Sequence, residues 1–197
     1  MDKKFYLYKT KKYFLKSTIR WEWYFILKNF KKYIESYSDF PKKGIIFRDT
    51  LKILQYPKVF NELIHEMSNT IIIKNADAIL AIDARGFIFG SAISSKLSKP
   101  MIVARKEGKL PGSLITKEYE LEYGKDKLSI QENAIEPFNS FAIVDDLIAT
   151  GGTVSSASEI IRSKGKEVTG VVVVVELAEI LRKENFKHPI HSLINFD

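Results

Sequence analysis

Apolar residues recur along most of the chain with two spacings, one typical of helices and one typical of buried strands. In PKVFNELIHEMSNTIII, the apolar residues between Val59 and Met67 repeat at helical spacing behind Pro57, a residue suited to a first helical turn. Two more helices are predicted in FIFGSAISSKL (87–97) and TVSSASEIIRSKG (153–165), the second ending at its glycine.

Short apolar runs between these helices predict strands. The runs are IIF, DAILAID, PMIVAR, FAIVDD and EVTGVVVVVEL, at residues 45–47, 77–83, 100–105, 141–146 and 167–177. Because most of them alternate with helices, the pattern predicts an α/β fold with a central parallel sheet flanked by helices on both faces. The five consecutive valines suit a central strand that is buried on both sides.

The pattern breaks between Arg105 and Phe141, where the sequence is polar and has no helical period. Alternation at LITKEYELEY and DKLSI predicts a β-hairpin that stands off the sheet. Long excursions in a compact domain are usually functional, so we interpret residues 106–136 as a flexible lid.

The net charge of +7 comes from the start of the chain. Residues 1–34 carry ten Lys or Arg and two acidic side chains, whereas residues 35–197 carry 21 and 22. The body of the protein therefore does not predict a nucleic-acid surface, and no nucleic-acid partner is expected. Helical spacing predicts an N-terminal helix over about 21–37, following a basic extension over 1–20.

No composition shift divides the remainder, so residues 21–197 are expected to form a single domain. The apolar runs of the front are short and broken by lysine, which fits neither a transmembrane segment nor a secretory signal. With no recognisable address, a cytoplasmic location is the default expectation. The absence of cysteine excludes thiolate nucleophiles and cysteine zinc sites, and His188 and His191 are expected to face solvent.

The stretch FAIVDDLIATGGTV joins a buried strand to a helix through two acids and a loop of small residues. In open α/β sheets, ligands bind beyond the carboxyl ends of the strands, where the next helix offers free N–H groups to a phosphate. The loop Ala149, Thr150, Gly151, Gly152 and Thr153 therefore reads as a phosphate cradle.

The paired acids upstream of that loop, Asp145 and Asp146, suit hydroxyl donors such as the diol of a ribose. A phosphate site beside a diol site describes a ribose 5-phosphate. The alternative is that the acids only end a strand and that Gly-Gly makes a turn with Thr153 as the helix N-cap.

VDDLIATGGT resembles the phosphoribosyl-pyrophosphate signature of the type I phosphoribosyltransferases. DFPKKGIIFRD, AIDARGFIFG, RKEGKLPG and YELEYGKDKLSIQ resemble segments of the adenine phosphoribosyltransferase branch, in the same order, and the resemblance covers residues 27–185. It implies the type I phosphoribosyltransferase fold and transfer of the phosphoribosyl group to adenine, giving AMP and pyrophosphate in purine salvage. It also implies a homodimer.

The resemblance assigns the pyrophosphate side of the site to the loop Ala84, Arg85 and Gly86, together with Arg105 and Lys109. Arg85 would stabilise the leaving group through its planar donor fork. Mg²⁺ is the implied cofactor. It is expected to be held mainly by substrate oxygens and water rather than by direct protein ligands.

For the base, the resemblance implies that Ile46, Phe47 and Leu147 enclose adenine and that backbone groups around Arg48 read its amino edge. Glu122 would take the proton lost on attack, and Tyr123 would hold the closed lid. Without the resemblance, Phe47 reads equally as core packing, and Glu122 as one of three solvated acids on a strand.

Two other functions stay open at this stage. One is a phosphoribosyltransferase for a different base, because the VDDLIATGGT loop does not specify adenine. The other is a non-catalytic sensor of phosphoribosyl pyrophosphate that binds nucleic acid through its basic front. The combined GIIFRD and LEYGK segments argue against the first, and retention of Arg85, Lys109 and Glu122 argues against the second.

Overall fold

The computed structural model describes residues 29–121, 124–177 and 188–196. Contacts group the chain into two compact units, Met1–Glu62 and Leu63–Asp197, each with its own sheet. Across these described ranges, no helix has both the length and the apolar character needed to cross a membrane.

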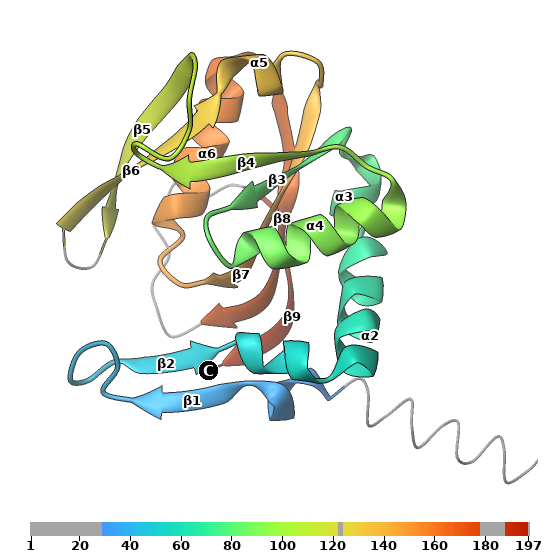
Figure 1. Cartoon of the computed structure of the whole chain (residues 1–197), viewed down its shortest axis with the longest axis vertical. Helices are drawn as coiled ribbons and strands as arrows, with labels where there is room; N and C mark the ends of the chain where they lie inside the picture. Colours follow the sequence, from blue (N-terminus) through green and yellow to red (C-terminus); the bar gives the residue numbers. More distant parts are fainter. Residues whose placement is uncertain (1–28, 122–123, 178–187, 197) are drawn as a thin grey trace, which may run out of the picture. The chain divides into compact units, whose positions relative to one another are not determined.

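The described part of the first unit contains a two-stranded antiparallel sheet of β1 and β2 (Figure 1). Its elements, in chain order, are η1 Phe30–Tyr33, β1 Glu35–Ser38, β2 Ile46–Asp49 and η2 Leu51–Gln55. The helix α2, Pro57–Ser68, starts in this unit and continues into the second. The strand predicted at 45–47 is thus confirmed, displaced by one residue.

The prediction of a helix over residues 21–37 is wrong for the described residues that follow η1. Residues 35–38 form β1, which pairs with β2 in the register Ser36↔Arg48. Arg48 Nη1 donates a hydrogen bond to Ser36 Oγ across the two strands at 2.6 Å. Pairing with β2 outweighs the helical spacing, because sheet contacts routinely override local propensity. Residues 21–28 lie outside the described ranges.

The second unit is built on a seven-stranded sheet with the order β5-β6-β4-β3-β7-β8-β9. Its strands are β3 Ala78–Ile82, β4 Met101–Lys106, β5 Leu114–Leu121, β6 Gly124–Gln131, β7 Ser140–Ile148, β8 Glu167–Leu177 and β9 Ile190–Phe196. Its own helices are α3 Ile71–Asn75, α4 Gly86–Leu97, α5 Glu132–Ile135 and α6 Gly152–Ser163. Strands β4, β3, β7, β8 and β9 run parallel, which confirms the predicted sheet.

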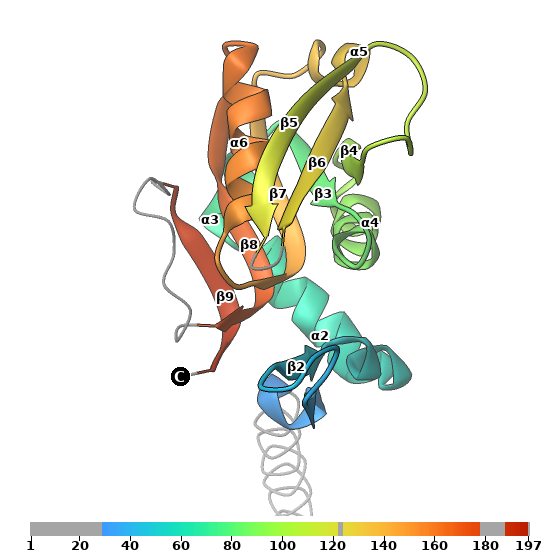
Figure 2. The ribbon, with the colours of Figure 1, turned by 90° about the vertical axis from the view of Figure 1, so that its left-hand side faces the viewer.

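Helices cover both faces of this sheet, as expected, with α4 on one side and α6 on the other (Figure 2). Every residue of β3 is buried, and so are the five consecutive valines of β8, residues 171–175. The α4 face is packed so closely that a Cβ on Gly90 would lie 2.7 Å from Ala81 Cβ. The long apolar runs of the sequence are therefore explained by burial on two faces.

The hairpin of β5 and β6 does not stand off the sheet, as the sequence had suggested. It forms the antiparallel edge of the same sheet, because β6 pairs with the end of β4 through Arg105↔Ser129 and Lys106↔Leu128. Leu128 and Ile130 are buried in the core that β7 and α6 share. Alternation of polar and apolar residues specified the hairpin but not the surface on which it packs.

The strand β9 was not anticipated, and neither was the environment of His188 at its start. His188 is half-buried, and its Nε2 lies 2.5 Å from Ser158 Oγ of α6. Burial lowers the pKa of His188 below its ordinary value, with the Arg162 charge adding to the effect. The expectation that this histidine faces solvent is wrong, whereas His191 is exposed.

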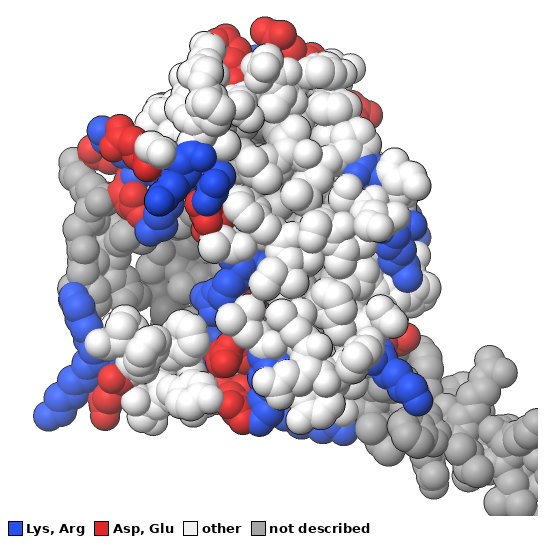
Figure 3. Space-filling model, in the orientation of Figure 1, with Lys and Arg blue, Asp and Glu red and all other residues white. Residues whose placement is uncertain are grey.

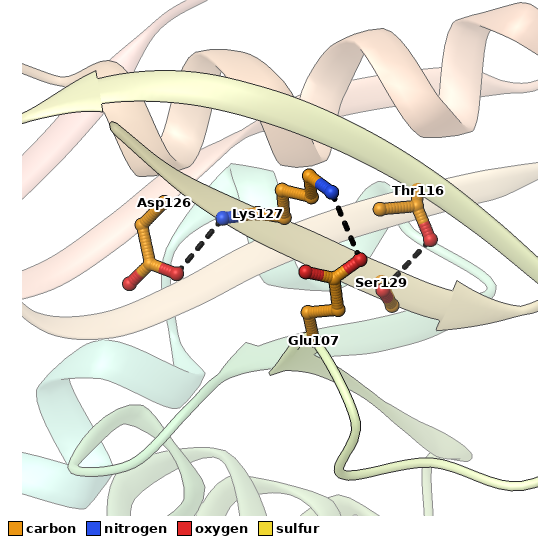
Figure 4. Close-up of polar contacts among 5 residues, drawn as sticks. All are labelled: Glu107, Thr116, Asp126, Lys127 and Ser129. Atoms are coloured by element: carbon orange, nitrogen blue, oxygen red, sulfur yellow. Dashed lines mark hydrogen bonds and ion pairs between the residues drawn. The ribbon is translucent and has the colours of Figure 1, made fainter. Parts of the chain in front are cut away.

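Basic and acidic side chains are interspersed on the face shown in Figure 3. The described residues also include ion pairs between neighbouring strands and loops, among them Lys127–Glu107 at 3.0 Å (Figure 4) and Lys106–Asp126 at 2.7 Å. This face of the described chain therefore offers no continuous basic surface of the kind that binds a nucleic-acid backbone.

Candidate active site

The predicted site residues of the second unit meet at the carboxyl ends of three neighbouring strands, β4, β3 and β7. Asp83 follows β3, Arg105 lies near the end of β4, and Asp145 and Asp146 lie near the end of β7. Parallel strands place these ends at one edge of the sheet, where ligands of open α/β folds bind.

The predicted phosphate cradle leads from β7 into α6. Gly151 has φ +78°, a left-handed conformation that favours glycine, and it occupies the N-cap position of the helix. No side chain of the described residues caps this end, so the alternative in which Thr153 is the N-cap is wrong. Because the first turn keeps backbone N–H groups available beside the positive end of the helix dipole, it suits a phosphate.

The two acids of β7 have different surroundings. Asp145 accepts a hydrogen bond on Oδ1 from the backbone N–H of Asp146 at 2.8 Å. Burial raises the pKa of Asp145 well above its ordinary value, and the neighbouring charge of Asp146 raises it further. A half-buried carboxylate with a raised pKa is typical of a functional site, where donors or cations of a ligand can stabilise its charge.

Asp146 lies against the loop that follows β3. Its Oδ2 is 3.1 Å from Arg85 Nε, and only 5% of its side chain is exposed. This ion pair joins the loop predicted to bind pyrophosphate directly to the acids predicted to bind ribose. Asp83 forms a separate ion pair, with Arg105.

Backbone packing also brings that loop close to β7. A Cβ placed on Gly86 would lie 2.8 Å from the carbonyl oxygen of Val144 and 3.0 Å from Asp145 Oδ1. Only glycine permits this approach without movement of the backbone. The peptide bond Asp83–Ala84, at the start of this loop, is cis.

Arg105 lies on the other side of the same loop. Its Nε is 3.0 Å from Asp83 Oδ2, and its guanidinium carbon lies 5.7 Å from the centre of the Phe87 ring. Arg105 Nη1 also donates to the carbonyl oxygen of Lys109 at 3.4 Å, while the Lys109 side chain is exposed. The structure thus places one of the expected cations, Arg105, beside Asp83, and it adds Phe87, for which the sequence held no signal beyond helical spacing.

The residues predicted to bind adenine are divided between the two units. Ile46, Phe47 and Arg48 lie on β2 of the first unit, where the Phe47 ring lies 5.1 Å from that of Phe40. Leu147 lies on β7 of the second unit. Glu122 and Tyr123 lie outside the described residues, so their roles stay predictions.

Sequence reasoning missed a polar group near the tip of the hairpin, where Lys106 of β4 meets Asp126 and Tyr119. Lys106 Nζ lies 2.7 Å from Asp126 Oδ2, and the Tyr119 hydroxyl donates to the same oxygen at 3.4 Å. The hydrogen bond from Lys106 lowers the pKa of Asp126, and the reciprocal contact raises the pKa of Lys106. Only strand register, which places Tyr119 opposite Asp126, could have signalled this group.

Known proteins share both the sequence and this architecture. The profile of the phosphoribosyl transferase domain matches residues 50–191. An adenine phosphoribosyltransferase of Prochlorococcus marinus (strain AS9601) is 56% identical over 168 residues, which cover 85% of this chain and 99% of the relative. The chain belongs to the adenine phosphoribosyltransferase family.

Solved structures of this family have the same fold. Adenine phosphoribosyltransferase from Thermoanaerobacter pseudethanolicus is 39% identical in sequence to this chain. Its crystal structure superposes with a TM-score of 0.80, and the match covers 86% of this chain and 99% of that one. The enzyme from Saccharomyces cerevisiae, solved with an imino-altritol bisphosphate and adenine, is 31% identical with a TM-score of 0.74 and coverages of 85% and 97%. Membership of the family therefore rests on sequence and fold over nearly the whole length of these relatives.

Proposed function

We propose that this protein transfers the phosphoribosyl group of phosphoribosyl pyrophosphate to adenine, forming AMP and releasing pyrophosphate. The contact between Arg85 and Asp146 carries the proposal, because it unites the leaving-group loop and the ribose acids in one site. The family relatives, which bear the name of this activity, support the same reaction.

Catalysis in this proposal is mainly positioning and electrostatic stabilisation. The 5-phosphate lies on the loop from Ala149 to Thr153 and accepts hydrogen bonds from the N–H groups that open α6. Asp145 and Asp146 accept hydrogen bonds from the ribose hydroxyls. Donors on the diol relieve the desolvation of Asp145, so substrate binding would lower the raised pKa of this carboxyl.

The bond between C1 of the ribose and the pyrophosphate oxygen breaks as the bond from C1 to adenine nitrogen forms. Arg85 stabilises the negative charge that the departing pyrophosphate gains. It lies in the loop with Ala84 and Gly86, and Arg105 and Lys109 contribute further positive charge. Asp146 and Asp83 hold the two guanidinium groups in place before substrate arrives. Such preorganisation lowers the reorganisation needed in the transition state.

The donor set fits a magnesium ion that enters with its substrate. Among the described residues no group of three His, Cys, Asp or Glu side chains could hold a metal, while Asp145 offers hard carboxylate oxygen near the ribose. Mg²⁺ keeps several waters and is usually bound through one or two carboxylates and substrate phosphates. When bound it supplies charge neutralisation at the pyrophosphate.

Adenine loses a proton from its imidazole nitrogen on attack, and we assign Glu122 as its acceptor and Tyr123 as a residue of the closed lid. Ile46, Phe47 and Leu147 enclose the base, and the backbone at Arg48 reads its amino edge. A lid within 106–136 would exclude water from the reacting carbon and prevent hydrolysis.

The remaining features of the proposal rest on the sequence and on its family resemblance. The catalytic domain extends over residues 21–197 behind the basic extension 1–20. The protein acts as a homodimer in the cytoplasm, in purine salvage.

The test is AMP formation from labelled adenine, phosphoribosyl pyrophosphate and Mg²⁺, with hypoxanthine, guanine and orotate in parallel. We expect turnover with adenine and none with the other bases. The variant Asp145→Asn should abolish it, while Asp77→Asn, the same chemical change at the opposite end of the sheet, should retain it. Asp77 accepts hydrogen bonds from the backbone N–H groups of Asn139 and Ser140 at 2.9 and 3.0 Å. Because Asp77→Asn could weaken these bonds, the thermal midpoint of this variant is measured alongside its activity.

Turnover with another base would overturn the adenine assignment but keep the ribose-phosphate site. Binding of phosphoribosyl pyrophosphate without turnover of any base would overturn the enzymatic proposal and favour a sensor. Equal activity of the Asp145→Asn variant and the unaltered chain would show that the acids of β7 do not hold the ribose.

A further inference from the structure

Phe40 is an exposed aromatic residue in the turn that connects β1 and β2 of the first unit. It is 52% exposed, and its ring centre lies 5.1 Å from that of Phe47 on β2, with an angle of 77° between the two ring planes. In such an edge-to-face pair the positive edge of one ring meets the negative face of the other, which adds attraction beyond the burial of surface. The contact therefore favours one orientation of the Phe47 ring.

Hydrogen bonds within the turn hold Phe40 in a defined place. The backbone N–H of Phe40 donates to the carbonyl oxygen of Ile45 at 3.3 Å, and the backbone N–H of Gly44 donates to Asp39 Oδ1 at 2.7 Å. Gly44 has φ +89°, a conformation that glycine adopts without steric cost. Because the turn is closed by these bonds, Phe40 stays beside the strand that carries Phe47.

Strand pairing fixes the backbone of Phe47 but not the plane of its ring. Phe47 lies opposite Tyr37 in the two-stranded sheet, and the neighbouring hydrogen bond from Arg48 to Ser36, at 2.6 Å, ties the strands together. The torsion that turns a phenylalanine ring about its Cβ–Cγ bond has broad minima, so backbone geometry alone does not set the ring plane. The edge-to-face contact with Phe40 restricts this rotation.

We propose that Phe40 is a positioning residue that sets the plane of the Phe47 ring and thereby strengthens the stacking of this ring on the base. This inference rests on the proposed function, in which Phe47 helps to enclose adenine. Stacking of flat rings depends on their relative orientation, and a ring that is oriented before the base arrives requires less ordering on binding. Phe40 therefore contributes to affinity for the base and not to affinity for the ribose phosphate.

The experiment compares the unaltered chain with Phe40→Leu, Phe47→Leu and the double variant. Calorimetry measures the affinity for AMP and for ribose 5-phosphate, which lacks the base, and steady-state assays give kcat and the KM values for adenine and phosphoribosyl pyrophosphate. Tyr56→Leu is the matched control, because it removes a 39% exposed ring from a second aromatic pair of this unit, in which Tyr33 and Tyr56 have ring centres 4.8 Å apart. Thermal unfolding is recorded for every variant.

Loss of the ring contact should weaken AMP binding about 3- to 10-fold in Phe40→Leu and raise the adenine KM by a similar factor. The affinity for ribose 5-phosphate, the KM for phosphoribosyl pyrophosphate and kcat should change less than about twofold. The double variant should bind AMP no more weakly than Phe47→Leu alone, because Phe40 acts through Phe47. Tyr56→Leu should bind AMP as the unaltered chain does.

The inference would be overturned by unchanged AMP affinity in Phe40→Leu, by additive losses in the double variant, or by an equal loss in Tyr56→Leu. A parallel fall of both affinities with the thermal midpoint of Phe40→Leu would also overturn it. Failure of the proposed function is distinguishable, because the unaltered chain would then bind AMP without forming it from adenine, and the AMP affinities would still decide the role of Phe40. If the unaltered chain bound AMP no more tightly than ribose 5-phosphate, Phe47 would have no base to stack on and the inference would fail.

Discussion

Substitution of Gly86 by alanine tests the close approach between the leaving-group loop and β7. The new Cβ would lie 2.8 Å from the Val144 carbonyl oxygen, and 3.0 and 3.1 Å from Oδ1 and Cα of Asp145. Two of these atoms belong to the backbone of a central strand, so the loop has to move by several tenths of an ångström. Overpacking of this kind costs about 1–3 kcal/mol, against which alanine regains up to about 1 kcal/mol of helix propensity at the start of α4.

The expected net loss of stability is therefore about 0–3 kcal/mol, with a fall of roughly 2–4 °C in Tm for each kcal/mol. The effect on activity should be larger, because the displacement falls on Arg85 and Asp145. We expect kcat/KM with adenine to fall at least about 10-fold, since misplacement of about 1 Å near the reacting groups costs about 100-fold.

Gly90→Ala is the matched control for this experiment. Its Cβ would lie 2.7 Å from Ala81 Cβ and 3.3 Å from Met101 Sδ, a similar crowding on the same helix but against the core. Both variants should lose stability in thermal and denaturant unfolding, whereas only Gly86→Ala should lose kcat/KM per folded molecule. Full activity of folded Gly86→Ala, or an equal loss in Gly90→Ala, would refute the argument that the loop needs this contact.

Three further substitutions test individual side chains. The raised pKa of Asp145 means that the folded state binds its proton more tightly than the unfolded state does, so its stabilising contribution is present at low pH and is lost as pH rises through that pKa. Asp145→Asn without substrate should therefore melt at a higher temperature than the unaltered chain at neutral pH. The difference between the two melting temperatures should shrink on acidification, and a difference that stays constant would contradict this reasoning. Arg85→Met removes the guanidinium partner of the buried Asp146; denaturant titration should show a loss of about 1–3 kcal/mol, and kcat should fall about 100-fold. Glu122→Gln should lower kcat by about 100-fold or more at unchanged phosphoribosyl pyrophosphate affinity, and retention of kcat in single-turnover assays would exclude Glu122 as the proton acceptor.

Much of the second unit was predictable from the sequence because its signals are local. Residues buried on both faces of a parallel sheet form continuous apolar runs, and β3, β7 and β8 were predicted from such runs. The loop before α6 was equally readable, since two adjacent glycines at a strand-to-helix junction leave few structural alternatives. In these segments local propensity and tertiary packing favour the same structure.

Predictions failed where packing partners come from distant parts of the chain. Residues 35–38 form β1 through pairing with β2, and β9 completes the sheet edge beside β8. The hairpin lies on the sheet because β6 pairs with β4. Propensity within a short window carries no information about such pairings.

The sequence by itself determined which chemical groups the site contains: two adjacent acids, a glycine-rich loop at a helix start, and arginines after neighbouring strands. Tertiary structure alone decided how they combine. Arg85 pairs with Asp146 of β7, and Lys106 of β4 pairs with Asp126 of β6. Ion pairs and buried hydrogen bonds depend on distances of a few ångströms between strands and helices. Those distances are set by the order of the strands in the sheet and by packing, and spacing along the chain does not encode them.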